Sequence, residues 1–255
     1  ATADQTTAEI KAHVTLQTSA TSNIGLGTGA VDSITTGDYN VGIGDDSGTS
    51  ITSGVENTSV GYYSLNETTT ASNNNAFGSE TLRRNTTGGN NSAFGHQALN
   101  ANTTASSNSA FGWRALLSNT TGASNVAMGA SALDANTTGS SNVAIGWNSM
   151  TSNTTASSNT AVGHSALGLN TTGSENTALG QYALYSNTEG TYNVALGRNS
   201  LYTNTTGAYN TAIGRQCLYA NTTPSYNTAT GFGALRLNTT GSHNTASGSY
   251  SLYSN

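Results

Sequence analysis

The chain has very little charge for its length. Of its 255 residues, 7% are Asp, Glu, Lys or Arg, against about 25% in typical soluble domains. With 7 Lys and Arg residues and a formal net charge of −5, the sequence offers no basic surface of the kind that nucleic-acid binding requires. The single cysteine, Cys217, excludes an internal disulfide and is expected to be a small buried residue. No apolar run approaches the about 18 residues of a transmembrane helix, so we expect no membrane insertion.

A strict 17-residue repeat accounts for most of the chain. One Asn recurs with this period in every copy from Asn23 to Asn244, and a glycine stands four residues after each of them. The unit reads N-x-A-x-G-x-x-A-L-x-x-N-T-T-G-x-x, and a second asparagine series with the same period runs from Asn85 to Asn255. Self-similarity at a fixed period is the signature of a solenoid or array.

The length of the unit favours β-structure. Helical repeats need roughly 33 to 47 residues, whereas this shorter unit fits one coil of two short strands and two turns. In Asn142–Gly146, Val143 and Ile145 share one side and Ala144 the other, which is strand alternation. A second short strand is expected at Ala183-Leu184, and the N-T-T-G segment is a turn.

These patterns predict an all-β chain. Residues 23–255 are expected to form a parallel β-solenoid (a β-roll or β-helix) of about 14 coils. Residues 1–22 form a lead-in segment, with a strand over Ile10–Leu16. Stacked coils would satisfy each other's backbone groups and chain the Asn amides into ladders along the stack.

The two glycine positions of the repeat lead to different predictions about backbone conformation. The glycine four residues after each Asn is never replaced, so we expect a positive φ or a close backbone approach there. The glycine of N-T-T-G is replaced by Ala105, Ala156 and Pro224. Because proline fixes φ at about −65°, that turn does not require a left-handed residue.

The two sides of the strand predict a core and an interface. The large residues are expected to point inward and face the Leu ladder: Phe94, Phe111, Met128, Ile145, Val162, Leu179, Leu196 and Ile213. The uniform small side is expected to face another subunit near the three-fold axis of a homotrimer, unless it only keeps a solvent face flat. It consists of Ala93, Ala110, Ala127, Ala144, Ala161, Ala178, Ala195, Ala212, Ala229 and Ala246.

No arrangement of residues points to catalysis. Glu80, Glu175 and Glu189 lie in different coils and cannot form the facing carboxylate pair of a glycosidase. We therefore expect no enzyme and no cofactor. The one acidic cluster, at Asp38, Asp45 and Asp46, is either a weak Ca²⁺ candidate or a solvated turn.

Rows of tyrosine are the candidate binding residues. They either stack on the sugar rings of a cell-surface glycan or pack between coils or subunits. One row is Tyr185, Tyr202, Tyr219 and Tyr253, and the other is Tyr192, Tyr209 and Tyr226, continued by His243. Trp113 and Trp147 are expected to be half-buried turn residues.

The repeat also carries a family resemblance. N-T-A-I-G followed by A-L and N-T-T-G resembles the repeats of tail-fibre proteins of tailed bacteriophages, marine ones in particular. The segment Asp4–His13 is similar to one common in such fibres. The N-V-A-I-G core is more loosely similar to the shorter head repeats of trimeric autotransporter adhesins. The resemblance implies a structural shaft segment of a virion tail fibre: a homotrimer that joins other virion proteins and contacts host cell-surface glycan.

Two other classes stay open. A bacterial surface adhesin would place the chain outside the cell, at the cell surface. An ice-binding β-solenoid would present a flat threonine array. The sequence offers only a partial one, interrupted by Val126, Val143 and Val194. It comprises Thr160, Thr177, Thr211, Thr228 and Thr245.

Overall fold

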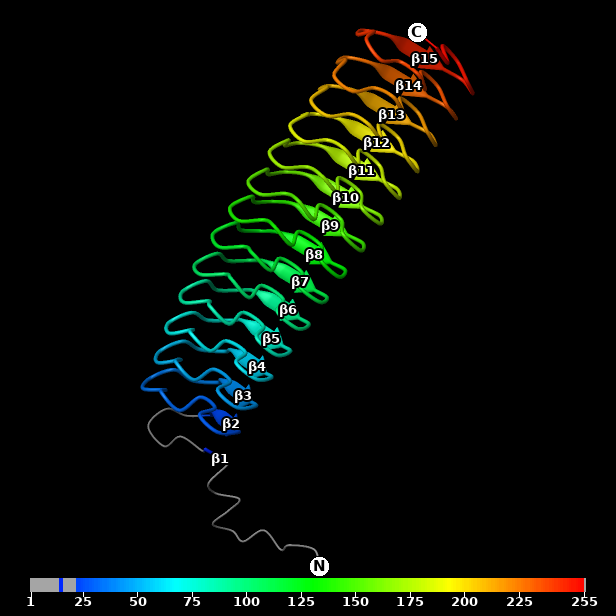
Figure 1. Cartoon of the computed structure of the whole chain (residues 1–255). Coiled ribbons are helices and arrows are strands. Elements are labelled where there is room, and N and C mark those ends of the chain that lie inside the picture. Colours follow the sequence, from blue (N-terminus) through cyan, green and yellow to red (C-terminus); the bar gives the residue numbers. More distant parts are fainter. Residues whose placement is uncertain (1–13, 16–21, 255) are drawn as a thin grey trace, which may run out of the picture. The chain divides into compact units, whose positions relative to one another are not determined.

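The computed structural model describes residues 14–15 and 22–254, and this part of the chain is all-β (Figure 1). The chain divides into two compact units, Ala1–Thr121 and Gly122–Asn255. Each unit is a parallel β-solenoid in which one short strand recurs in every coil. The prediction of a β-solenoid with 17-residue coils is confirmed.

In the first unit the strands follow one another in chain order. β1 pairs antiparallel with β2, placing Val14 opposite Leu26. The later strands pair in parallel, each residue opposite its equivalent in the next copy of the repeat. The strands are β1 (Val14–Thr15), β2 (Ile24–Leu26), β3 (Val41–Ile43), β4 (Thr58–Val60), β5 (Asn75–Phe77), β6 (Ser92–Phe94) and β7 (Ser109–Phe111). Of the lead-in strand predicted over Ile10–Leu16, Val14 and Thr15 form β1, and the rest lies outside the described residues.

The second unit repeats the arrangement. All its neighbouring strands pair in parallel with the same register of one repeat. The strands are β8 (Val126–Met128), β9 (Val143–Ile145), β10 (Thr160–Val162), β11 (Thr177–Leu179), β12 (Val194–Leu196), β13 (Thr211–Ile213), β14 (Thr228–Thr230) and β15 (Thr245–Ser247).

Each coil has one strand rather than the two that were predicted. The Ala183-Leu184 segment lies in a turn, and Leu184 has a φ of 53°. Leucines at the same repeat position have φ values between 46° and 54°. Because a strand needs negative φ, this left-handed leucine bends the chain, and it places the side chain in the centre of the coil.

The two sides of the strand are reversed relative to the prediction. Ala144 is completely buried inside the coil, whereas Ile145 is 36% exposed and points outward. From Ala93 to Ala229 the alanines at this position are fully buried within the single chain, and Ala246 is 5% exposed. The prediction that they form a subunit interface is therefore wrong. The prediction of an inward-pointing row of large residues is wrong for the same reason.

The narrow space between the strand and the opposite turn explains why the small residues point inward and the large ones outward. A Cβ atom added to Gly42, at the alanine position of an early coil, would lie 2.8 Å from Val31 Cγ1 and 2.9 Å from the Ser47 carbonyl oxygen. One added to Gly25 would lie 2.6 Å from the Ala30 oxygen. In these two coils the opposite turn leaves no room even for a methyl group, and in later coils alanine fills the gap, so the large side chains point outward.

Polar ladders complete the interior. Asn74 is fully buried, and its Oδ1 accepts hydrogen bonds from the Asn91 backbone N–H at 3.0 Å and from Asn91 Nδ2 at 3.1 Å. In the second series, Asn102 Nδ2 donates to Asn85 Oδ1 at 2.8 Å. Both series repeat this bonding from coil to coil, which confirms the predicted amide chains. They run beside a ladder of fully buried leucines, with Met150 in one coil.

The invariant glycine behaves as predicted. Gly61 has a φ of 131°, and a Cβ there would lie 2.5 Å from the Gly78 carbonyl oxygen of the next coil. Both the positive φ and the close approach exclude a side chain. The N-T-T-G glycines, such as Gly88, are absent from the positive-φ set, consistent with Ala105 and Pro224 at that position.

Candidate functional site

In one turn of the coil the exposed residues vary from copy to copy, although the buried leucine within the turn repeats. This turn lies five to ten residues after the ladder Asn, directly after the strand, and much of it reaches solvent. In the second unit the fifth residue is Ala130, Trp147, His164, Gln181, Arg198, Arg215, Phe232 and then Ser249. Stacking fixes the buried positions, so a position that stacking leaves free is available for function. We call this turn in Gly122–Asn255 the variable corner.

Aromatic rings form a continuous chain along the variable corner. Trp147 stacks on His164, with ring centroids 4.7 Å apart and planes 5° apart. His164 contacts Tyr182 at 4.9 Å, and Tyr182 meets the edge of Tyr185 at 5.4 Å. Trp147 is 58% exposed and Trp113, in the first unit, is 51% exposed. Both therefore keep close to half of their surface covered, as predicted, and leave the rest accessible.

The first predicted tyrosine row continues this chain. Tyr185, Tyr202 and Tyr219 stack with centroid distances of 5.5 and 5.2 Å. Burial, followed by the neighbouring tyrosines, raises the pKa of Tyr202. Arg236 takes the next place in the row. Its guanidinium lies 5.4 Å from the Tyr219 ring, and Nη1 donates to the Tyr253 hydroxyl at 2.6 Å.

The second row lies at another turn, just before the ladder Asn. Tyr192, Tyr209, Tyr226 and His243 stack at 4.8, 5.0 and 4.9 Å, with planes 7°, 2° and 12° apart. Tyr192 donates its hydroxyl to Glu175 Oε1 at 3.1 Å, and this bond raises the pKa of the phenol. Both faces of the two middle rings are covered by neighbours. They therefore present only edges and hydroxyls, and a sugar ring cannot stack on them.

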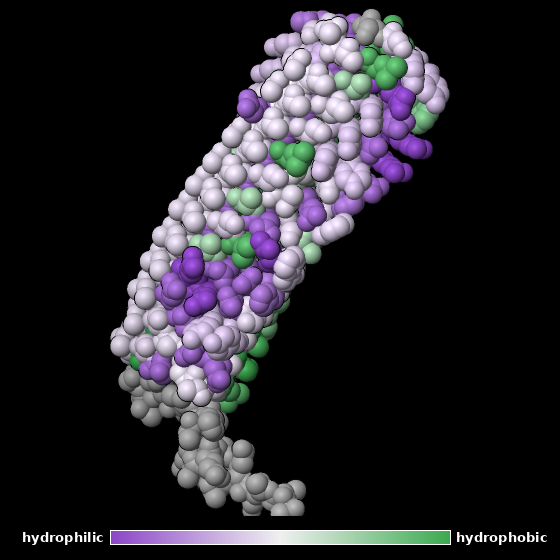
Figure 2. Space-filling view, viewed as in Figure 1, coloured by the Kyte–Doolittle hydropathy of each residue, from purple (hydrophilic) through white to green (hydrophobic). Residues whose placement is uncertain are grey.

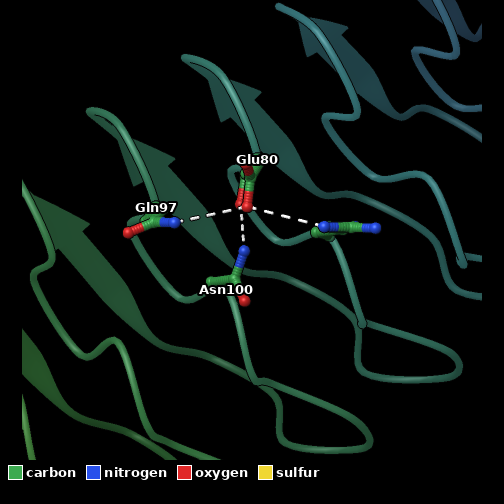
Figure 3. Close-up of polar contacts among 4 residues, drawn as sticks. Glu80, Gln97 and Asn100 are labelled. Carbon is green, nitrogen blue, oxygen red and sulfur yellow. Dashed lines mark hydrogen bonds and ion pairs between the residues drawn. The ribbon is translucent and has the colours of Figure 1, made fainter.

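A polar cluster in the first unit is internally paired. Glu80 Oε2 accepts from Gln97 Nε2 at 3.3 Å and forms an ion pair with Arg83 at 3.6 Å, while Asn100 Nδ2 donates to the Glu80 carbonyl oxygen at 2.9 Å (Figure 3). Arg83 also lies 4.8 Å from the Tyr63 ring centre. These contacts link neighbouring coils, so the cluster is explained by stacking.

The three acidic candidates do not come together. Asp45 Oδ1 accepts the Thr28 backbone N–H at 3.0 Å in the turn after β3, whereas Asp38 lies before that strand. Among the residues that the structure describes, no three His, Cys, Asp or Glu side chains form a group able to hold a metal ion.

Cys217 is buried, as predicted. It occupies a small-residue position inside the coil, and its Sγ lies 3.2 Å from the Ala229 carbonyl oxygen, to which the thiol donates. Burial raises the pKa of this thiol to about 11, so it is inert near neutral pH.

The strand face is the second exposed surface, and the sequence patterns assigned it to the core. Its apolar residues form what we call the outward stripe. In the first unit it comprises Leu26, Ile43, Val60, Phe77, Phe94 and Phe111, and in the second unit Met128, Ile145, Val162, Leu179, Leu196 and Ile213. Leu179 is 49% exposed and Met128 43%. Figure 2 shows hydrophobic side chains along the margin formed by strands β2 to β5.

In the first unit the three phenylalanines of the stripe stack on one another. The centroid distances are 4.7 Å between Phe77 and Phe94 and 4.9 Å between Phe94 and Phe111. All three side chains remain partly exposed. The signal that could have revealed this orientation is the small size of every neighbouring residue, because a position that holds only Gly, Ser or Ala is the tightest one.

Comparison with known proteins does not show the family of this chain. No family model matches the chain, and no match was found among the curated proteins or among the solved structures. Across residues 14–15 and 22–254 the structure contains no pocket. It also has no helix there that is long and apolar enough to cross a membrane.

Proposed function

We propose that this chain is a structural segment of a bacteriophage tail fibre and that it assembles as a homotrimer through the outward stripe. The observation that carries the proposal is the stripe itself. In each unit six consecutive coils present an apolar side chain that is at least partly exposed at the same strand position. Monomeric soluble proteins rarely leave so extended an apolar surface in water. The resemblance of the repeats to tail-fibre repeats supports the same assignment.

The geometry of the stripe favours copies of the same chain as its partner. Its residues recur in strict register, as in the pairing of Leu179 with Leu196 and of Leu196 with Ile213. A partner must therefore offer an apolar surface with the same period, and a second copy does. Copies related by rotation about an axis parallel to the stack would each bury their stripe, and such a rotation closes into a ring.

The first experiment measures native mass by light scattering during size-exclusion chromatography. We expect three chains for the wild type and a single chain for the double variant Ile145→Asp/Leu179→Asp, because carboxylates cannot be buried unpaired. The matched control is Leu169→Asp, which alters a 41% exposed leucine away from the stripe and should leave the trimer intact. A wild-type mass of one chain would contradict the proposal.

Ice binding is the second candidate, and the orientation of the strand face favours it. The face that carries the partial threonine ladder points outward, and in β14 it presents Thr228 and Thr230 around the buried Ala229. Thermal hysteresis separates the two candidates. A trimer that buries this face should show none, whereas a monomer with measurable hysteresis would favour ice binding over the fibre.

A further inference from the structure

Two arginines stand next to each other on the variable corner without an anionic partner in the described part of the chain. Arg198 and Arg215 occupy the same place in neighbouring coils, where the Gln216 N–H donates to the Arg198 carbonyl oxygen at 3.0 Å. Adjacent strands lie about 4.8 Å apart, so the two cations repel. Both side chains are exposed, and neither guanidinium forms an ion pair or hydrogen bond with another described residue. Fold stability does not account for this pair.

The surrounding charge is uniformly positive. From residue 190 to the end, the chain contains no Asp or Glu, but it contains Arg198, Arg215 and Arg236. In this unit Glu175 and Glu189 lie near the other turn, and Asp134 lies four coils before Arg198 at the corner. An anion approaching these coils therefore meets cations at the variable corner and no opposing carboxylate.

Aromatic side chains frame the arginine pair. Tyr182 lies at the corner in the coil before Arg198, and Phe232 lies 5.7 Å from the Arg215 guanidinium in the coil after it. An unbroken series of ring contacts continues from Phe232 through Tyr250 at 4.9 Å and Tyr253 at 5.5 Å. It then passes through Arg236 to Tyr219. The cations thus lie within a rim of partly exposed rings.

We propose that this part of the variable corner binds an acidic polysaccharide. Arg198 and Arg215 bind its carboxylate or sulfate groups, and the exposed edges of the rings that frame them, Tyr182 and Phe232, contact the sugar. The proposal rests on the tail-fibre role proposed above, because it names the surface chemistry that the fibre would contact. In a trimer three such corners would act together and raise the avidity.

Binding to polymers of defined charge tests the proposal on the intact chain. The probes are alginate, which carries carboxylates, dextran sulfate, neutral dextran, and double-stranded DNA as a polyanion without sugar hydroxyls at its charged edge. We expect binding to alginate or dextran sulfate, whichever group the corner prefers, and none to dextran. Arg198→Gln and Arg215→Gln should each weaken Kd about tenfold.

The matched control is Arg84→Gln, which removes an exposed arginine of the first unit that forms no ion pair among the described residues. This change should leave Kd within about twofold. Native mass and circular dichroism show that each variant is folded and assembled. Failure of the wild type to bind either acidic polymer, or equal affinity for DNA with the same arginine dependence, would overturn the proposal. A trimer that fails to bind overturns only the polysaccharide site, whereas a monomer that binds overturns only the assembly.

Discussion

Two adjacent asparagines in the first unit provide a matched test of the buried amide ladder. Asn74 is completely buried and belongs to the ladder, whereas Asn75 begins β5 and is exposed on the outward face. Asn74 Nδ2 donates to Asn57 Oδ1 at 3.1 Å and to the Gly88 carbonyl oxygen at 3.0 Å. Its Oδ1 is the acceptor for the Asn91 backbone N–H.

The expected loss of stability depends on which buried groups lose their only hydrogen-bond partner. After Asn74→Ala, the Gly88 oxygen keeps a donor in Asn85 Nδ2, but the buried Asn91 N–H has none. An orphaned buried donor costs about 1–3 kcal/mol, and each other lost hydrogen bond about 1 kcal/mol. We therefore expect Asn74→Ala to lower the free energy of unfolding by about 4 kcal/mol. Asn75→Ala should change it by less than about 0.5 kcal/mol.

The isosteric change Asn74→Asp adds a pH dependence. An oxygen replaces Nδ2 and faces the acceptors Asn57 Oδ1 and the Gly88 carbonyl, so burial and repulsion raise the pKa of the new carboxyl group in the folded state. The unfolded value is about 3.9. The penalty is small below about pH 4, where the carboxyl is protonated in both states. It grows as the pH rises and at pH 7 should reach about 5 kcal/mol.

Equilibrium urea unfolding, followed by circular dichroism at one protein concentration, measures all four variants from pH 3 to pH 8. The corresponding Asn75→Asp change should show almost no pH dependence. Equal losses at positions 74 and 75, or a loss from Asn74→Asp that does not grow with pH, would refute the buried-ladder reasoning.

Three further predictions concern the interior. Ala144→Leu should destabilise the fold by about 3 kcal/mol, because only a methyl group fits across the coil at this position. Ile145→Ala should cost about 1 kcal/mol or less in a dissociated chain. Urea unfolding measures both changes, and a larger loss from Ile145→Ala than from Ala144→Leu would mean that Ile145 belongs to the core. Gly61→Ala should cost about 3 kcal/mol or more, since it combines a φ of 131° with a Cβ placed against the next coil, and a thermal unfolding temperature equal to that of the wild type would exclude this strain. Cys217 should resist iodoacetamide at pH 8 until urea unfolds the chain. Because its folded pKa is raised to about 11, stability should fall as the pH rises from the ordinary thiol value of 9.0 towards 11. The fall should be smaller in Cys217→Ser, where tyrosines with raised pKa values, such as Tyr202, still contribute.

Much of the candidate surface could be anticipated from position in the repeat. Tyr185, Tyr202 and Tyr219 share one place in the unit, and so do Tyr192 and Tyr209. The constant period therefore places each row in line. The contacts that join different places in the unit were not predictable. His164, Tyr182 and Tyr185 meet only because the turn after the strand brings the fifth, sixth and ninth residues together.

The sequence alone determined the coil length, the parallel register, the two asparagine ladders and the glycine turn. Each of these recurs with the period, and in-register stacking is the arrangement that lets the backbone of every coil bond to its neighbours. Only the tertiary structure decided which side of the strand is inside. Alternation separates Ala144 from Ile145 but cannot orient the pair. The left-handed turn at the leucine brings the opposite wall of the coil to within one methyl group of the strand, so alanine fills the interior and the large side chains face outward.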